Sequence, residues 1–259
     1  MRAIPPRRVE RLTFYTHTLC PYAARVALTL REKGAAFDQV HVDLARKPAS
    51  FLKVNPRGLV PALDVDGEVL VESIDVCRWI DENLEGKPLM PPEGTSARSN
   101  AEALITICPQ IVSRGLSAVS GPGTRSWGIG SQGPSSRQLD DFRESLAILE
   151  RSLVDGGNAG PYLSGKDVSL ADLVLYPFLS RFDMALDSIG AVTVTELNAA
   201  VAQWMAAMGT RPSCVWADAD RSLLTEAYRK HECLDFFDYV TYGEWDLHPH
   251  NRSRVRPKS

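Results

Sequence analysis

The chain lacks the features that direct proteins into membranes or onto acidic polymers. Its 259 residues contain no run of about 18 apolar residues, the length that a membrane-spanning helix needs. The start carries no apolar secretory signal, and the Arg-rich stretch 1–11 is too short for the transit peptide of an organelle. With a formal net charge of −3, no overall basic field attracts nucleic acid or acidic lipid. We expect a cytoplasmic protein with a small-molecule partner, and no nucleic acid or membrane partner.

The cysteines and histidines also form no pattern of their own. The five cysteines are an odd number scattered along the chain, which does not fit a disulfide framework. No two of them have the spacing of a metal-binding pair, and the five histidines add none. The sequence therefore predicts free thiols in a reducing compartment and no metal site.

The first third of the chain alternates strand-like and helix-like segments. Strand patterns over 12–15 and 37–44 flank a helix that runs from Pro21 to Gly34. A loop or short helix follows, and then a hairpin turns at Asp66-Gly67 before a helix that begins at Ser73. This order, βαβ and then ββα, predicts an α/β domain of the thioredoxin-like type over residues 10–87.

The rest of the chain shows few strand signals. A Pro-rich and Gly-rich stretch over 88–96 predicts a linker, and an all-helical domain is expected over 97–230. A C-terminal extension over 231–259, with a cluster of aromatic residues followed by a basic end, is expected to be partly disordered. The predicted helices of the second domain cover 100–119, 137–153, 170–182, 196–208 and 218–228.

Two local patterns stand out in the helical domain. Ser169 to Asp172 resembles a capping box, with Val168 and Leu173 at the positions of a hydrophobic staple, so the apolar helix that follows should be the buried centre. A stretch rich in Gly, Ser and Pro over 120–136 predicts a mobile loop, which contains Trp127.

The residue with the clearest chemistry is Cys20. Pro21 suits the first position of a helix, so Cys20 falls at the N-cap, where free N–H groups and the helix dipole favour an anion. This position should lower the pKa of the thiol below its usual value of about 8.5 and make it a nucleophile. Ala23 stands where a second cysteine would complete a dithiol motif, so the second thiol must come from solution. The alternative is that Cys20 is a small buried apolar residue.

Four motifs, in order and at matching spacing, resemble the cytosolic glutathione S-transferases over residues 12 to about 228. They are Cys20-Pro21-Tyr22-Ala23, the run from Asn55 to Leu63, Glu72-Ser73 at a helix start, and the cap from Ser169 to Asp172. The cysteine motif is similar to the omega, lambda and dehydroascorbate reductase classes, which use cysteine where most others use tyrosine or serine.

The resemblance implies how glutathione is held as co-substrate. It implies a cis bond before Pro61, so that the Val60 main chain pairs with the cysteinyl part of glutathione like an added strand. The helix start at Ser73 would bind the γ-glutamyl carboxylate, while Glu72 would meet the ammonium group. Pro61 also suits a turn ahead of a strand.

The resemblance further implies that Lys47 binds the glycyl carboxylate. Arg46 and Lys53 are near enough in the sequence to replace it, and Lys47 also reads as a solvated surface charge. No motif fixes the acceptor pocket. The candidates for it are Tyr22, for which packing is favoured over a role as acid, and Arg114, Trp127 and Phe178.

The predicted activity is that of a glutathione transferase acting as thiol transferase or reductase through an enzyme–glutathione mixed disulfide. Deglutathionylation and dehydroascorbate reduction are examples of such redox and detoxification chemistry. The alternatives are conjugation or isomerisation of electrophiles, a non-enzymatic binding protein with the same fold, and a more distant resemblance to intracellular chloride channel proteins. The resemblance leaves monomer and homodimer open.

Overall fold

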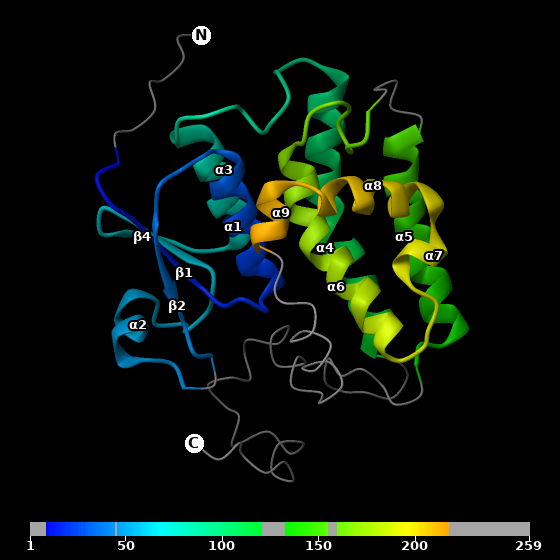
Figure 1. Cartoon of the computed structure of the whole chain (residues 1–259), viewed down its shortest axis with the longest axis horizontal. Coiled ribbons are helices and arrows are strands. Elements are labelled where there is room, and N and C mark those ends of the chain that lie inside the picture. The colour runs from blue at the N-terminus through cyan, green and yellow to red at the C-terminus, as the bar shows by residue number, and fades with distance from the viewer. Residues whose placement is uncertain (1–8, 45, 121–132, 155–159, 218–259) are drawn as a thin grey trace.

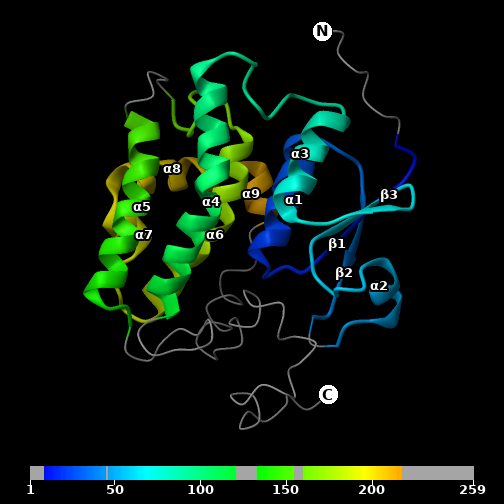
Figure 2. The same ribbon diagram turned by 180° about the vertical axis from the view of Figure 1, so that it is seen from behind.

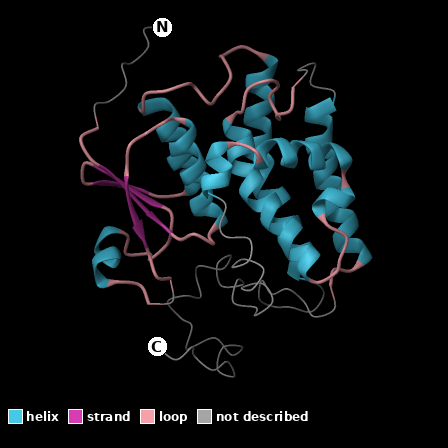
Figure 3. Ribbon diagram, viewed as in Figure 1, coloured by secondary structure: helices cyan, strands magenta, loops and turns pink. Residues whose placement is uncertain are grey.

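The computed structural model describes residues 9–44, 46–120, 133–154 and 160–217. The first half forms a four-stranded sheet of order β2-β1-β3-β4, in which β2 is parallel to β1 and the other pairs are antiparallel (Figure 3). This arrangement confirms the thioredoxin-like prediction. Its elements are β1 (Leu12–Thr16), α1 (Pro21–Glu32), β2 (Asp38–His41), α2 (Ala49–Val54), β3 (Ala62–Val65), β4 (Glu68–Leu70) and α3 (Ser73–Asn83).

The hairpin between β3 and β4 follows directly from its turn residues. Asp66 and Gly67 both adopt positive φ, 54° and 94°, as a two-residue turn of this type requires. The Gly67 N–H donates to the Asp64 carboxylate at 2.7 Å, which fixes the turn. Leu63 then lies opposite Leu70 in the register, as the sequence pattern predicts.

The second strand is shorter than predicted. It ends at His41 instead of continuing to Leu44, and Val40 is 38% exposed because β2 lies at the edge of the sheet. The Val42 N–H still donates to the Thr16 carbonyl at 2.8 Å. Val42 and Leu44 then pack into the core beyond the strand, so their apolar pattern reports burial and not strand length.

The second half has helices as its regular elements within the described residues, apart from an isolated bridge between Tyr162 and Gly165. The predicted helix over 196–208 is confirmed from 199 onward but is wrong at its start, because Asn198 is extended and its side chain accepts the Val201 N–H at 3.0 Å, which begins a new helix. The short helix α9 (Pro212–Ala217) was not expected. Segment 218–228, Trp127 and the C-terminal extension lie outside the described residues. The helices are α4 (Ser96–Ser120), α5 (Ser136–Val154), α6 (Leu170–Ser188), α7 (Val194–Leu197), α8 (Ala199–Gly209) and α9 (Pro212–Ala217).

Helices α1 and α3 lie between the sheet and the helical half, while α2 lies on the other side of the sheet (Figures 1 and 2). Helix α1 packs against α6, whose residues are almost all buried, as its apolar sequence predicts. Because α1 packs against α6, it lies where the two halves of the chain meet.

Among the described helices, none combines the length and the apolar character that crossing a membrane requires.

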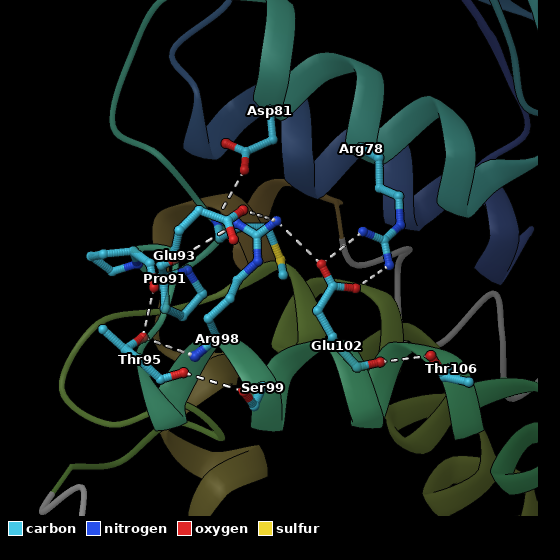
Figure 4. A network of polar contacts seen from close by, with 11 residues as sticks. Arg78, Asp81, Pro91, Glu93, Thr95, Arg98, Ser99, Glu102 and Thr106 are labelled. Carbon is cyan, nitrogen blue, oxygen red and sulfur yellow. Dashed lines mark hydrogen bonds and ion pairs between the residues drawn. The ribbon is translucent and has the colours of Figure 1, made fainter. Parts of the chain in front are cut away.

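The segment between α3 and α4, predicted as a linker, is held to both helices by polar contacts (Figure 4). The Asp81 carboxylate on α3 accepts the N–H groups of Leu89 and Met90 at 2.7 and 2.9 Å. On the α4 side, Arg98 pairs with Glu93 of this segment at 3.1 Å, and Glu102 of α4 pairs with Arg78 of α3 at 2.5 Å. These contacts fix how α4 leaves the first half.

The start of α6 is organised by the buried carboxylate of Asp172. It accepts the Ser169 N–H at 2.7 Å, which confirms the capping box, and the Leu163 N–H at 2.9 Å. The indole N–H of Trp204 on α8 donates to the same carboxylate at 2.8 Å. Burial raises the pKa of Asp172, although these hydrogen bonds oppose the rise.

We predict that Asp172→Ala lowers the free energy of unfolding by roughly 3 kcal/mol, because it leaves several buried N–H donors without an acceptor. Urea denaturation followed by circular dichroism measures this change. The matched control is Asp167→Ala, which removes an exposed carboxylate paired with Lys87 and should cost less than about 1 kcal/mol. Equal effects of the two changes would contradict the structural role of Asp172.

Candidate active site

Cys20 is the N-cap of α1, with Pro21 at the first helical position as predicted. The Ala23 N–H donates to the Cys20 Sγ at 3.3 Å, and the thiol donates to the Val60 carbonyl at 3.8 Å. The side chain is closed to solvent. Hydrogen bonding from a helix N–H stabilises negative charge on the sulfur, so this position suits a thiolate.

The chain opposite Cys20 has the geometry that the resemblance implied. The Val60–Pro61 peptide bond is cis, and both residues are buried just before β3. The Val60 carbonyl, which was predicted to pair with a ligand, accepts the Cys20 thiol. Cys20, Val60 and Pro61 are thus brought together.

The start of α3 carries a second cluster. Glu72 has a φ of 66°, an uncommon conformation for a residue other than glycine, and precedes Ser73 at the helix N-terminus. The exposed Glu72 carboxylate pairs with Arg57 at 2.6 Å. The sequence analysis missed Arg57, although it lies within the run 55–63. A carboxylate and a guanidinium therefore stand side by side at this edge.

Lys47 lies against the same run. Its side chain approaches Gly58 so closely that a Cβ at Gly58 would lie 2.8 Å from the lysine Cδ, and Gly58 itself has a φ of 65°. Partial burial lowers the pKa of Lys47. Lys47 and Arg57 thus flank Gly58 with two positive groups.

Arg25 is the main site residue that the sequence analysis missed. Its guanidinium is buried and donates to the Ser73 Oγ at 3.1 Å, to the Val174 carbonyl at 2.8 Å and to the Cys108 sulfur at 3.0 Å. It also lies over the Phe178 ring at 4.4 Å. Arg25 of α1 therefore connects α3, α4 and α6. A basic residue within an otherwise apolar helix segment was the available signal.

The candidate acceptor residues do not all converge. Tyr22 and Phe178 pack edge to face with ring centroids 4.7 Å apart, and burial raises the pKa of Tyr22 although Arg25 lowers it. Arg114 instead donates to the Asp141 carbonyl at 3.1 Å and the Ser145 hydroxyl at 3.2 Å on α5. Among the candidates that the structure describes, Tyr22 follows Cys20 in α1 and packs on Phe178, whereas Arg114 binds α5.

The other described cysteines are buried and form no disulfide. Burial raises the pKa of Cys77 to about 12. Burial also raises the pKa of Cys108, although the positive charge of Arg25 opposes this. Within the described residues, no group of three or more His, Cys, Asp or Glu side chains could hold a metal ion.

Comparison with known proteins gives consistent matches. Residues 14–88 match the family model for the glutathione S-transferase N-terminal domain, and residues 132–207 match the model for the C-terminal domain, together more than half of the chain. The chain is 26% identical to glutathione S-transferase L3 of Arabidopsis thaliana over 230 residues, which is 87% of this chain and 90% of the relative. It is 26% identical to glutathione S-transferase omega-1 of Sus scrofa over 202 residues, 77% of each chain. The solved structure of rice GST1 in complex with glutathione has a TM-score of 0.67 at 20% identity, covering 90% of this chain and 99% of that one.

We predict that iodoacetamide at about pH 7.5 alkylates Cys20 before Cys77 and Cys108, because only a small fraction of a buried thiol with a raised pKa is ionised at that pH. Peptide mass spectrometry after a time course measures each site. Cys77, with a pKa of about 12, should react only after unfolding. Labelling of Cys77 or Cys108 as fast as Cys20 in the folded protein would contradict this order.

We also predict that Arg25→Met lowers the free energy of unfolding by roughly 2 to 3 kcal/mol, because Ser73 and the Val174 carbonyl lose a buried donor. The matched control is Arg31→Met on the same helix, where the exposed guanidinium lies 3.7 Å from the centre of the Trp216 ring. That change should cost less than about 1 kcal/mol. If thermal and urea unfolding show equal losses, Arg25 does not connect the halves as described.

Proposed function

Because the chain belongs to the glutathione S-transferase superfamily and is similar to its lambda and omega members, we propose that it is a thiol transferase that works through Cys20. The observation that carries this proposal is the position of Cys20. Its sulfur sits at a helix N-terminus and against the carbonyl that precedes a cis proline. A family member with tyrosine or serine at this place would instead activate the thiol of glutathione itself.

Glutathione would lie along the edge formed by the Val60 main chain and the start of α3. The N–H and carbonyl of Val60 can pair with the cysteinyl part of the tripeptide. The N-terminus of α3 at Ser73 suits the γ-glutamyl carboxylate, and Glu72 suits the ammonium group. Lys47 and Arg57 offer positive charge for the glycyl carboxylate, and Arg57 also neutralises Glu72 before the ligand arrives.

Binding of the tripeptide would also activate the sulfur. The Val60 carbonyl can accept either the Cys20 thiol or the N–H of the ligand as its strand-like partner. When the ligand takes this carbonyl, the thiol would lose this acceptor, while the Ala23 N–H still donates to the sulfur. Donors alone favour the charged form of a thiol. A glutathione mixed disulfide bound here would therefore promote the thiolate that attacks its glutathione sulfur.

The proposed reaction has two thiol–disulfide exchanges. The Cys20 thiolate attacks the glutathione sulfur of a mixed disulfide, forms an enzyme–glutathione disulfide and releases the partner as a thiolate. A second glutathione, after losing its proton, attacks the glutathione sulfur of that disulfide. Oxidised glutathione leaves, and the electron pair of the broken bond returns to Cys20. Ala23 stands where an internal resolving cysteine would be, so the second thiol must be external.

We place this activity in the cytoplasm, in redox maintenance and detoxification, with a small electrophilic or disulfide acceptor. The support is chemical, because buried free cysteines such as Cys77 and Cys108 suit a compartment that keeps thiols reduced. A reducing compartment also supplies the glutathione that the second exchange consumes.

We predict that Cys20→Ser lowers thiol transferase activity on a glutathione mixed disulfide by at least about 100-fold, because an alkoxide does not form at neutral pH. Binding to immobilised glutathione should persist, since Val60 and Ser73 are unchanged. The matched control is Cys214→Ser, another buried cysteine, which should keep the activity. Full thiol transferase activity in Cys20→Ser would overturn the assignment. A gain in conjugation of chlorodinitrobenzene by that variant would support the role of position 20 as the switch between the two chemistries.

A further inference from the structure

Arg181 of α6 is a second buried arginine near the active site. Its side chain is 1% exposed. Nε donates to the Leu19 carbonyl at 3.3 Å, and Nη1 donates to the Pro177 carbonyl at 2.9 Å within the same helix. Nη2 is buried and has no hydrogen-bond partner, the single such side-chain atom among the described residues.

An unsatisfied donor on a buried cation is costly. Arginine stays charged in proteins, and a buried donor without an acceptor loses the hydrogen bonds that water would give it. Within the described part of the chain, Arg181 forms no ion pair with a carboxylate, and its two acceptors are neutral carbonyls. Buried polar groups of this kind call for an explanation, and one explanation is a ligand that supplies the acceptor.

Arg25 shows that burial at this place does not by itself leave a donor unsatisfied. It lies at the same contact between α1 and α6, and Nε, Nη1 and Nη2 all have acceptors. The packing of α1 on α6 is therefore compatible with a complete set of hydrogen bonds. The difference between the two arginines is that Arg25 turns toward Ser73, whereas Arg181 reaches the chain just before Cys20.

The position of Arg181 indicates what kind of ligand its unsatisfied Nη2 donor could bind. The Leu19 carbonyl that it binds belongs to the peptide unit leading into Cys20, so the guanidinium lies beside the N-terminus of α1. Both groups favour negative charge. Phe178, one turn earlier on α6, packs against Tyr22 on the same side. Arg181 thus reaches the residue before Cys20 from α6, in the helical half.

We propose that Arg181 is the anion-binding group of a second subsite beside Cys20, which takes a carboxylate of the acceptor or of the second, resolving thiol. The proposal rests on the proposed function, since it concerns the reactant that enters after the first glutathione is bound. That first tripeptide has its own carboxylate partners at Ser73, Lys47 and Arg57, so Arg181 serves the other reactant. The subsite selects anionic disulfides and thiols over neutral ones of equal size.

The test compares two alkylating reagents that differ in charge, iodoacetate and iodoacetamide. In both reactions the Cys20 sulfur bonds to the reagent's CH₂ carbon and iodide leaves. Their rate ratio at Cys20, read by peptide mass spectrometry, reports anion binding beside the sulfur and requires no glutathione. We expect Arg181→Met to lower the iodoacetate-to-iodoacetamide ratio by about 10-fold or more.

The matched control is Arg143→Met, which removes one positive charge from the exposed surface of α5 and should change the ratio by less than about 2-fold. Circular dichroism checks that each variant folds. Should Arg181→Met fail to fold, Arg181→Lys and Arg181→Gln replace it, because lysine keeps the charge and glutamine keeps only an N–H group. The subsite is supported if Arg181→Lys keeps the iodoacetate-to-iodoacetamide rate ratio of the wild type and Arg181→Gln lowers it. Equal rate ratios in both variants and in the wild type overturn it.

A second measurement addresses the exchange itself. The protein is loaded with glutathione on Cys20 and then resolved with mercaptoacetate or with 2-mercaptoethanol, an anionic and a neutral thiol. The Arg181 variants should slow the first reaction selectively. If loading fails but the alkylation ratio behaves as expected, the thiol transferase proposal falls and the anion site stands. If loading succeeds, but the variants change neither the alkylation rate ratio nor the ratio of the resolution rates with mercaptoacetate and 2-mercaptoethanol, the subsite is wrong and the function stands.

Discussion

The structure depends most on the buried guanidinium of Arg25. Its three nitrogen atoms bind the start of α3, the middle of α4 and a carbonyl of α6, so one side chain joins four helices from both halves of the chain. Cys20 begins the helix that carries this arginine. Because the fork of arginine is planar and its contacts are directional, the distance from the cysteine to Ser73 is fixed by the same group that orients the helical half.

The features that the sequence predicted well are those whose cause is local. Pro21 and Cys20 place the start of α1 without help from the rest of the fold, and Asp66-Gly67 selects its own turn. The capping box before α6 is formed within four consecutive residues, Ser169 to Asp172. The roles of Val60 and Ser73 came from resemblance to a family, since nothing in their own chemistry names a ligand.

What the sequence did not reveal depends on contacts between distant residues. Arg181 meets Leu19 across 162 positions and Arg25 meets Cys108 across 83, and a basic residue in a helix is ordinarily assigned to the surface. The predictions for the end of β2 and for the helix around Asn198 failed for a related reason. Apolar spacing indicates which residues are buried, whereas the hydrogen bonds that end a strand or restart a helix depend on neighbours that the spacing does not specify.

The contact between the Cys20 thiol and the Val60 carbonyl has a consequence for the survival of the protein under peroxide stress. Thiolates that water and peroxide can reach are converted stepwise to sulfinic and sulfonic acids, the last steps of which are irreversible. Here the resting sulfur is buried, and its thiol donates a hydrogen bond to the Val60 carbonyl. In the proposed reaction, glutathione at the Val60 main chain would release the sulfur from this hydrogen bond, so the reactive thiolate would form while the reductant is bound.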